Sequence, residues 1–433
     1  MRAIVQKSEI YGSIESPPSK SYTHRAFVCA LLSSETTRIR NSLLCDDTRV
    51  TLQFSELMGA DVNIESDIII TGPNELVAPI HPMDCQESGT SLRLFTAISS
   101  LAKGRCVLTC TPSLQRRPIS ELISALNQLG IKASSLKNDG RPPVEILGNA
   151  SFGGSAEIRG DISSQYISGL LLTCAKGQDE TRIKLTTHLE SRPYVEMTLD
   201  VMEQFGVVVE PSEKWDSFSI PGEQEYRLSK YDIEGDYSSA AFLMVAGALT
   251  GQIQVNGLSK NTNQGDARIV TLLQEMGVSI NSTRKGCIVN KSEPTSLDID
   301  ASNIPDLVPI LAVLATISEG TTCIRNAKRL RYKESDRLAA ITQELKKMGA
   351  NISETEDAIT IIGPTKLHGA IVDSHGDHRI GMACAVAGFT AEGTTVIEGI
   401  ECLSKSYPQF IEDMQSVGGQ IKISQGSETE VKK

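Results

Sequence analysis

The stretch SDRLAAITQELKKMGANI, residues 335–352, contains the pattern on which the fold of this chain depends. Its apolar residues Leu338, Ile341 and Leu345 recur at spacings of three and four, which predicts an amphipathic helix. Gly349 follows at the position where a left-handed turn commonly ends a helix. A β-rich stretch comes next. The sequence therefore predicts a helix, a glycine turn and a strand in this order.

The same pattern occurs six times along the 433 residues. The other five copies end on glycines that are spaced, like the first, by 69 to 76 residues: Gly59, Gly130, Gly206, Gly277 and Gly418. A second element also recurs six times and consists of an apolar helix, a tight turn and a β-branched strand. These helices are apolar nearly all round, so we expect them to be buried. Each unit reads as buried helix, strand, amphipathic helix, strand and strand.

The length of the chain indicates two domains, because single hydrophobic cores stop growing near ~250–300 residues. Three units in each domain place residues 14–229 in the first domain and residues 1–13 and 230–433 in the second. The N-terminal strand precedes the first unit and could complete a sheet of either domain. Strands alternate with helices throughout, which favours an α/β fold over a helical solenoid.

Composition excludes several classes of protein. Hydrophobic residues make up 40% and charged residues 22%, which is typical of a globular chain rather than a disordered one. The net charge of −11 and the single Trp disfavour binding to nucleic acid. No apolar run is long enough for a membrane span, and the first 20 residues lack the apolar core of a secretory signal. The ten cysteines contain no C-x-x-C pair, which predicts buried thiols in the cytoplasm rather than a zinc ribbon.

Basic residues gather where the predicted helices begin. A helix N-terminus carries unpaired N–H groups and about half a positive charge, so it attracts anions and disfavours cations. Seven cations nevertheless lie at such junctions: Lys20, Arg25, Arg117, Lys333, Arg337, Arg379 and Lys405. A bound anion would remove this conflict, so the sequence predicts a multiply anionic small substrate. For each cluster taken alone, plain helix capping or a solvated charged turn stays an alternative.

For three residues, an ordinary structural explanation stands beside the functional one. Asp306 precedes an apolar helix and could simply cap it. Glu334 lies in a run of charges that could be a solvated turn. Arg117 precedes Pro118, which we expect in the first turn of the next helix. His375 and His378 have the spacing of a metal-binding pair, but two histidines without a third ligand are weak evidence, so no metal site is predicted.

Nine motifs between residues 18 and 408 together identify a resemblance. They are PSKSYTHR, SGTSLR, RRPIS, SSQY, SRPY, NIPD, RYKESDRL, GDHR and SKSYP. In this order they resemble the motifs of the 5-enolpyruvylshikimate-3-phosphate synthase (3-phosphoshikimate 1-carboxyvinyltransferase) family of enolpyruvyl transferases. RYKESDR followed by DHR is highly specific, whereas SGT alone is not. The resemblance implies a two-domain inside-out α/β barrel of six βαβαββ repeats, three per domain, with the active site in the interdomain cleft.

The resemblance also implies a reaction. The enolpyruvyl group of phosphoenolpyruvate passes to the 5-hydroxyl of shikimate 3-phosphate, and phosphate is released, by addition and elimination through a tetrahedral ketal. This step belongs to the shikimate pathway to chorismate and the aromatic amino acids, and its family is the target of glyphosate. No metal or organic cofactor is implied. The expected partners are the two small substrates, with no nucleic acid and no membrane, and the expected state is a monomer.

Carried over by motif, the resemblance assigns residues to each substrate. The residues implied for phosphoenolpyruvate are Lys20, Gly89, Arg117, Gln165, Arg337, Arg379 and Lys405. Those implied for shikimate 3-phosphate are Lys20, Ser21, Arg25, Ser163, Ser164, Gln165, Ser191, Asp306 and Lys333. Asp306 is the implied proton acceptor from the 5-hydroxyl and Glu334 the implied donor to C3 of phosphoenolpyruvate. Lys20 and Lys333 could assist these proton transfers.

The chain departs from the common family pattern at four positions. Pro18 stands where the family often has Gly, and Arg329 stands where it often has Asn. Glu87 and Ser88 replace the common Asn and Ala before Gly89. Glu87 places a negative charge near an expected anion site, which leaves the affinity for phosphoenolpyruvate and the response to glyphosate open.

Two other functions remain in competition. UDP-N-acetylglucosamine enolpyruvyl transferase shares the fold and the donor, but it usually carries a reactive Cys on a loop near the Arg117 region. Here the corresponding segment is short, and Cys110 lies in an expected strand. A non-catalytic ring protein such as a sliding clamp also uses six similar units. It would need stripes of Lys and Arg, which the acidic total disfavours.

Overall fold

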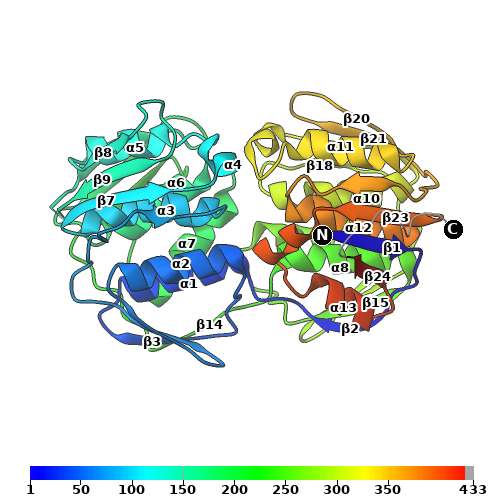
Figure 1. Cartoon of the computed structure of the whole chain (residues 1–433), viewed down its shortest axis with the longest axis horizontal. Coiled ribbons are helices and arrows are strands. Elements are labelled where there is room, and N and C mark those ends of the chain that lie inside the picture. The colour runs from blue at the N-terminus through cyan, green and yellow to red at the C-terminus, as the bar shows by residue number, and fades with distance from the viewer. Residues whose placement is uncertain (150, 425–433) are drawn as a thin grey trace. The chain divides into compact units, whose positions relative to one another are not determined.

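The structure is a computed structural model that describes residues 1–149 and 151–424. The chain divides into two compact units. The N-terminal unit is Pro18–Glu234, and the C-terminal unit combines Met1–Pro17 with the residues from Gly235 onwards. Within the described ranges the strands form six four-stranded sheets, three in each unit (Figure 1).

The N-terminal unit places three sheets around its helices. Its most buried helices are α1 (Lys20–Leu31), α3 (Gly89–Ile98) and α6 (Ser164–Cys174). The others are α2 (Asp46–Leu57), α4 (Pro112–Gln115), α5 (Ser120–Gln128), α7 (Arg192–Gln204) and the 3-10 turn η1 (Ser99–Leu101). The first sheet has the strand order β14 (Lys230–Asp232), β3 (Thr36–Arg40), β5 (Ile68–Thr71), β4 (Asp61–Ile64). The second has the order β6 (Met83–Asp84), β7 (Gly104–Thr109), β9 (Val144–Gly148), β8 (Lys132–Ser135). The third has the order β10 (Gly154–Ile158), β11 (Thr181–Leu185), β13 (Ser217–Ile220), β12 (Glu210–Pro211).

The C-terminal unit has the same plan. Its most buried helices are α8 (Tyr237–Thr250), α10 (Val308–Ile317) and α12 (His378–Thr390). The others are α9 (Arg268–Glu275), α11 (Arg337–Lys347), α13 (Phe410–Ser416) and the 3-10 turns η2 (Gly265–Ala267), η3 (Pro305–Leu307), η4 (Lys328–Tyr332) and η5 (Ile400–Lys405). The sheets are β22 (Ile371–Asp373), β23 (Thr394–Glu398), β1 (Arg2–Gln6), β24 (Gln420–Ser424); β2 (Tyr11–Glu15), β15 (Gln252–Asn256), β17 (Gly286–Asn290), β16 (Ile280–Ser282); and β18 (Asp298–Asp300), β19 (Gly320–Arg325), β21 (Ile359–Gly363), β20 (Asn351–Glu354).

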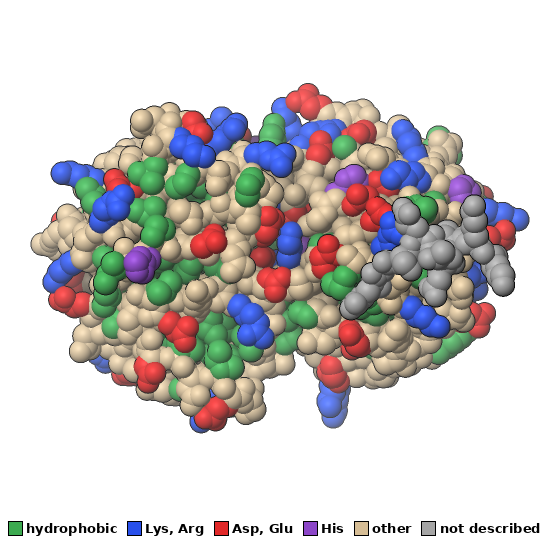
Figure 2. Space-filling view, in the orientation of Figure 1, with side chains coloured by type: hydrophobic (Ala, Val, Ile, Leu, Met, Phe, Trp, Pro, Cys, Tyr) green, Lys and Arg blue, Asp and Glu red, His purple; other side chains and the backbone are tan. Residues whose placement is uncertain are grey.

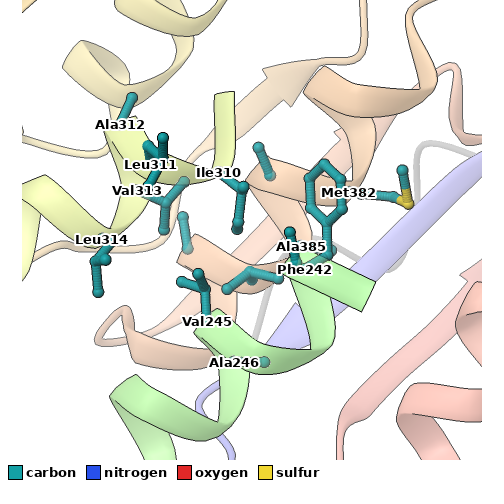
Figure 3. Packing of buried hydrophobic residues seen from close by; sticks show 14 of the residues in the cluster. Phe242, Val245, Ala246, Ile310, Leu311, Ala312, Val313, Leu314, Met382 and Ala385 are labelled. Atoms are coloured by element: carbon teal, nitrogen blue, oxygen red, sulfur yellow. The ribbon is translucent and has the colours of Figure 1, made fainter. Parts of the chain in front are cut away.

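The helices predicted to be apolar all round form the core of this unit, as expected. Every residue of α8 is buried. In Figure 3, Phe242 and Val245 of α8 lie among side chains of α10 and α12, such as Leu311 and Met382. Helices α8, α10 and α12 all pack on one another. Because these helices have no polar face, burial on all sides is the arrangement that removes most apolar surface from water.

The six repeated glycines confirm the predicted order of helix, turn and strand. Each lies two residues after the last residue of a helix, and each has a positive φ, between 79° at Gly206 and 105° at Gly59. A side chain with a Cβ rarely adopts this backbone conformation, so glycine ends the helix at low cost.

Two strands, β14 and β2, each pair within one unit, although the helix that follows them in the chain belongs to the other unit. β14 leads into α8 but pairs in parallel with β3, opposing Tyr231 to Ile39. β2 leads into α1 but pairs in parallel with β15, opposing Ile14 to Val255. The predicted boundaries at 13/14 and 229/230 are therefore wrong by four and five residues, because the units divide at 17/18 and 234/235. The N-terminal strand β1 completes a sheet of the C-terminal unit, between β23 and β24.

On the face drawn in Figure 2, Lys and Arg side chains are interspersed with Asp and Glu rather than gathered in a stripe. In the ranges that the structure describes, no helix is long and apolar enough to cross a membrane.

Candidate functional site

The predicted site residues fall into two groups, one in each unit. The hydroxyl cluster in the N-terminal unit consists of Lys20, Ser21, Arg25, Gly89, Arg117, Ser163, Ser164, Gln165 and Ser191. The carboxylate cluster in the C-terminal unit consists of Asp306, Lys333, Glu334, Arg337, Arg379 and Lys405. Most of them lie in the first turn of a helix or within a few residues before it, whereas Arg25, Arg117 and Lys405 do not. Both clusters thus lie where free N–H groups and helix dipoles favour negative charge.

Lys20 begins α1 and makes an ion pair that the sequence did not reveal. Its Nζ lies 2.9 Å from Oδ2 of Asp47, and the two side chains are 16% and 11% exposed. Asp47 lies in the first turn of α2, where acidic residues are common, so it could not be distinguished from an ordinary helix-start acid. The pair holds the Lys20 ammonium at the start of α1.

Arg25 is a buried cation whose hydrogen bonds go to neutral oxygens. Its Nε donates to Oγ1 of Thr198 at 2.8 Å, its Nη1 to the carbonyl of Ser21 at 2.8 Å and its Nη2 to the carbonyl of Tyr194 at 2.7 Å. Burial lowers the pKa of Arg25 to about 10, so it stays charged at neutral pH. A buried charge held only by dipoles is well suited to receive an anionic ligand.

Gly89 allows two guanidinium groups to approach the first turn of α3. A Cβ atom at this position would lie 2.8 Å from Nη1 of Arg93 and 3.1 Å from Nη1 of Arg117. Arg117 does not begin a helix as predicted, and Pro118 is not in a first turn: both lie in the loop between α4 and α5. This loop, rather than a helix start, brings Arg117 to Gly89.

Gln165 is fixed by two residues of the SGTSLR motif. Its Oε1 accepts from Nη1 of Arg93 at 2.6 Å, and its Nε2 donates to Oγ1 of Thr90 at 2.8 Å. Ser163 caps α6 by accepting from the Gln165 N–H at 3.3 Å, so its alternative interpretation as a cap is confirmed at least in part. Arg93 is a site residue that the sequence analysis missed, although it lay inside a quoted motif.

Ser191 adopts a strained backbone conformation at the start of α7. Its φ of 53° is left-handed, and its side chain makes no capping hydrogen bond. Strain of this kind is often retained where a ligand is bound. The next residue, Arg192, stacks on the single tryptophan, Trp215, with 4.0 Å between the guanidinium carbon and the ring centroid.

A chain of hydroxyl groups links the starts of α1 and α3 through α2. Nδ1 of His24 lies 2.7 Å from Oγ1 of Thr51, which lies 2.8 Å from Oγ of Ser91, which in turn lies 2.7 Å from Oγ of Ser88. Burial, with Lys20 and Arg25 nearby, lowers the pKa of His24 well below its ordinary value. The chain is therefore uncharged and holds the helix starts in register.

Arg337 is the centre of the carboxylate cluster. Its side chain is 2% exposed and donates to three carboxylates: Nη1 to Asp306 at 2.7 Å, Nη2 to Glu334 at 2.6 Å and Nε to Asp377 at 2.7 Å. Although burial opposes it, these three carboxylates raise the pKa of Arg337 well above its ordinary value. Asp377 is fully buried and was missed by the sequence analysis, although it lay inside the GDHR motif.

Asp306 and Glu334 do not cap helices. Asp306 lies in η3 and accepts from Arg337 and, at 3.0 Å, from Nη2 of Arg379. Glu334 lies between η4 and α11, whose cap is Asp336. The capping interpretation of Asp306 and the solvated-turn interpretation of Glu334 are therefore wrong, because both side chains bind buried guanidinium groups.

An acid and an amine of the same cluster both have lowered pKa values, for different reasons. Burial alone would raise the pKa of Asp306, but Arg379, Lys333 and Arg337 lower it well below its ordinary value. Burial lowers the pKa of Lys333 to about 8, with Asp306 opposing the shift. A carboxylate that stays ionised thus lies near an amine that can exchange a proton close to neutral pH.

The loop that precedes α12 positions Arg379 and Lys405. Asp377 caps this helix by accepting from the Arg379 N–H at 3.0 Å. Lys405, at the end of η5, donates to the carbonyl of Gly376 at 2.8 Å.

Among the described residues, no group of three or more His, Cys, Asp and Glu is placed to hold a metal ion.

Comparisons with known proteins identify relatives of this chain. The family model described as EPSP synthase (3-phosphoshikimate 1-carboxyvinyltransferase) matches residues 4–414. A 3-phosphoshikimate 1-carboxyvinyltransferase from Methanocorpusculum labreanum is 42% identical over 98% of this chain and 100% of its own. A solved EPSP synthase from Acinetobacter baumannii is 28% identical, with a TM-score of 0.84 over 98% of this chain and 100% of that one. The enolpyruvyl transferase NikO from Streptomyces tendae, 18% identical with a TM-score of 0.78 over 98% and 99%, shows the same mixed α/β fold.

Proposed function

The chain belongs to the EPSP synthase (3-phosphoshikimate 1-carboxyvinyltransferase) family, and from that premise we propose that the hydroxyl and carboxylate clusters are the two halves of its active site. The enzyme transfers the enolpyruvyl group of phosphoenolpyruvate to shikimate 3-phosphate and releases phosphate, a step of the shikimate pathway towards aromatic amino acids. The observation that carries the site assignment is that each unit holds buried cations among these residues: Arg25 and Arg117 in one, Arg337 and Arg379 in the other.

We propose that the hydroxyl cluster binds the phosphorylated acceptor. Arg25 supports this role because its buried charge is held by neutral oxygens only. Lys20, Ser21, Ser163, Ser164 and Ser191 complete the proposed acceptor site, together with Asp306 and Lys333 from the other cluster. Gln165 is proposed to contact both substrates, and its fixed side-chain amide supports a positioning role.

The proposed donor site uses guanidinium and ammonium groups. Phosphoenolpyruvate carries a carboxylate and a phosphate, and planar guanidinium groups bind such anions through paired hydrogen bonds. The residues proposed to bind it are Lys20, the Gly89 backbone, Arg117, Gln165, Arg337, Arg379 and Lys405. Because three carboxylates already accept from Arg337, we propose that it mainly orients Asp306 and Glu334, while Arg379 and Arg117 contribute more of the binding energy.

The proposed chemistry has two steps. In the addition, the acceptor oxygen bonds to C2 of phosphoenolpyruvate, Asp306 takes the hydroxyl proton, and a proton adds to C3 as the double bond opens. In the elimination, the C2–O bond to phosphate breaks, C3 loses a proton, and the double bond forms again. Both steps need an acid and a base whose pKa values differ. Asp306, with its low pKa, and Lys333, with a pKa of about 8, have such different values.

Glu334 is the proposed donor to C3. Its oxygen accepts from Nη2 of Arg337 at 2.6 Å, which favours the ionised carboxylate. We therefore propose that Lys333 first passes a proton to Glu334 and that Glu334 delivers it to C3. Lys20, held by Asp47, is proposed to assist on the other side.

Three broader statements are also proposals. The six sheets with their helices support the six-repeat inside-out barrel, with the two units as its two domains. The ten free thiols, nine of them buried, support a cytoplasmic location. The monomeric state stays a prediction.

A phosphate-release assay tests the proposed function. With phosphoenolpyruvate present, we expect phosphate release to need shikimate 3-phosphate and not to occur with UDP-N-acetylglucosamine. Asp306→Asn is the matched control, because it removes the proposed base with little change of shape. Release with the nucleotide sugar, or none with shikimate 3-phosphate in the folded protein, would contradict the assignment.

A further inference from the structure

Asp266 is a buried carboxyl group near the carboxylate cluster to which no role has been assigned above. It lies in η2, directly before α9, and is 2% exposed. Its Oδ2 accepts a hydrogen bond from Oγ of Ser238 on α8. Its Oδ1 is wholly buried and has no hydrogen-bond partner in the part of the chain that the structure describes. One hydroxyl donor is little compensation for an ionised carboxylate at this depth.

The groups that act on Asp266 come from three elements. Asp306 on η3 and Asp236 at the start of α8 both oppose a negative charge on it, whereas Arg379 on α12 favours one. Arg379 already donates to Asp306 at 3.0 Å, so its charge is shared. Burial, followed by the charge of Asp306, raises the pKa of Asp266 to about 7. Geometry and electrostatics therefore both favour the protonated form.

Counting charges leads to the same result. Apart from Lys405, which donates to the carbonyl of Gly376, the carboxylate cluster with Asp377 contains three acids, Asp306, Glu334 and Asp377, and three cations, Arg337, Arg379 and Lys333. Asp266 is a fourth acid with no cation of its own. If it ionises, the cluster gains a negative charge close to Arg379, the residue proposed to bind an anionic substrate.

We propose that Asp266 is a positioning residue for the anionic donor, and that its carboxyl group stays protonated so that the charge of Arg379 is available to phosphoenolpyruvate. This inference rests on the proposed donor role of Arg379. Loss of the Asp266 proton weakens donor binding, and a bound anion in turn favours retention of that proton. The use of phosphoenolpyruvate should therefore fall as pH rises through the pKa of Asp266, whereas binding of shikimate 3-phosphate alone should not.

Asp266→Asn tests the proposal because it fixes the neutral form and keeps an oxygen to accept from Ser238. We would measure kcat/KM for phosphoenolpyruvate from pH 6 to pH 9 at saturating shikimate 3-phosphate. The ratio of variant to wild type at each pH removes the titration of the substrates. We expect this ratio to be near one at pH 6 and to rise several-fold by pH 8, while the decline attributable to Lys333 near pH 8 stays in both enzymes. A ratio that does not change with pH would overturn the proposal, because it would show a structural role only.

A second variant gives the opposite shift. Ser238→Ala removes the hydrogen bond that lowers the pKa of Asp266, so the decline of wild-type activity should move to higher pH. Infrared difference spectra of Asp266→Asn against wild type at pH 6 should also show loss of one protonated-carboxyl C=O band, whether or not the variant turns over. An unchanged profile in Ser238→Ala, or no such band, would overturn the inference. If wild type itself releases no phosphate with shikimate 3-phosphate, the proposed function is contradicted rather than this inference. The infrared spectra would still show whether Asp266 is protonated.

Discussion

The two clusters use the same architectural position for different electrostatic tasks. In the hydroxyl cluster, buried Arg25 donates to three neutral oxygens, so its positive charge is not cancelled by the protein. In the carboxylate cluster, buried Arg337 donates to three carboxylates, and the charges there are nearly balanced. The first arrangement prepares a site for an added anion. The second holds acids and bases at different pKa values, which proton transfer requires.

The largest expected effect is a difference in unfolding free energy between variants that lack Arg337 and variants that lack Arg25. Arg337→Met leaves three buried carboxylates without their common partner, so we expect the unfolding free energy of the C-terminal unit to fall by about 3–5 kcal/mol. The matched variant Arg25→Met removes hydrogen bonds to neutral groups, and we expect a loss of about 1–3 kcal/mol in its own unit. Denaturant unfolding at pH 7, analysed as two transitions, measures both.

Acidification sharpens this prediction. The pKa of Asp306 is held well below 3.8 in the folded enzyme, so its stabilising contribution is present above that value and is lost as pH falls through the folded pKa. The stability difference between wild type and Arg337→Met should therefore persist down to about pH 4 and shrink as pH falls below that value. An equal loss for the two arginine variants at pH 7 would remove the distinction between the clusters.

The next effect concerns proton transfer, in which we propose that the carboxylate cluster has the main role. Asp306→Asn and Glu334→Gln should each lower turnover at least ~10²-fold, the usual scale for losing a positioned acid or base. Exchange of the C3 protons of phosphoenolpyruvate with solvent, followed by NMR during turnover, should slow in Glu334→Gln. Near wild-type turnover in both variants would show that neither carboxylate carries a proton, and Lys20 or Lys333 would become the candidate.

A smaller effect tests which substrate Arg379 and Arg25 each bind. Arg379→Ala should lower kcat/KM for phosphoenolpyruvate by about 10- to 100-fold, because one partner of a desolvated charge pair is lost. Its affinity for shikimate 3-phosphate, measured by calorimetry without the donor, should change little. Arg25→Ala should give the reverse result. If Arg379→Ala mainly weakens the acceptor, the assignment of the two clusters is reversed.

The smallest expected effect concerns Glu87, the acidic departure from the family pattern. Its Oε1 accepts from the hydroxyl groups of Thr111 and Ser113, so it is held by neutral donors. Glu87→Gln keeps an acceptor and removes the charge, so we expect KM for phosphoenolpyruvate to fall by no more than about fivefold, equivalent to about 1 kcal/mol. Ser88→Ala is the control, since it changes the neighbouring residue without changing charge. A rise in KM would mean that Glu87 contributes to the site.

Local features of the fold were predictable from the sequence, whereas some pairings were not. Apolar spacing and a helix-ending glycine act within a few residues, so segments such as 335–352 reveal helix, turn and strand directly. The pairing of β2 with β15 and of β14 with β3 joins residues more than 190 positions apart. Nothing local distinguishes these strands from their neighbours, which is why both domain boundaries were misplaced.

The site shows the same division. Lys20, Arg337 and Arg379 were found because a cation at a helix start conflicts with the helix dipole. Asp47 and Asp377 were missed, because an acid at a helix start is an ordinary cap and needs no further explanation. Their role depends on a partner 27 to 40 residues away, which becomes visible only when the helices are packed.

The position of β1 has a consequence for biosynthesis. This strand, residues 2–6, lies between β23 and β24, whose residues are the last of the described strands to leave the ribosome. The N-terminal unit has all its strands once Glu234 is made, so it can fold while the rest of the chain is still being translated. Strand β1 must instead wait unpaired until β23, about 400 residues further along the chain, has been made. A cell that makes this enzyme therefore has to keep an exposed β-strand from aggregating until translation is nearly complete.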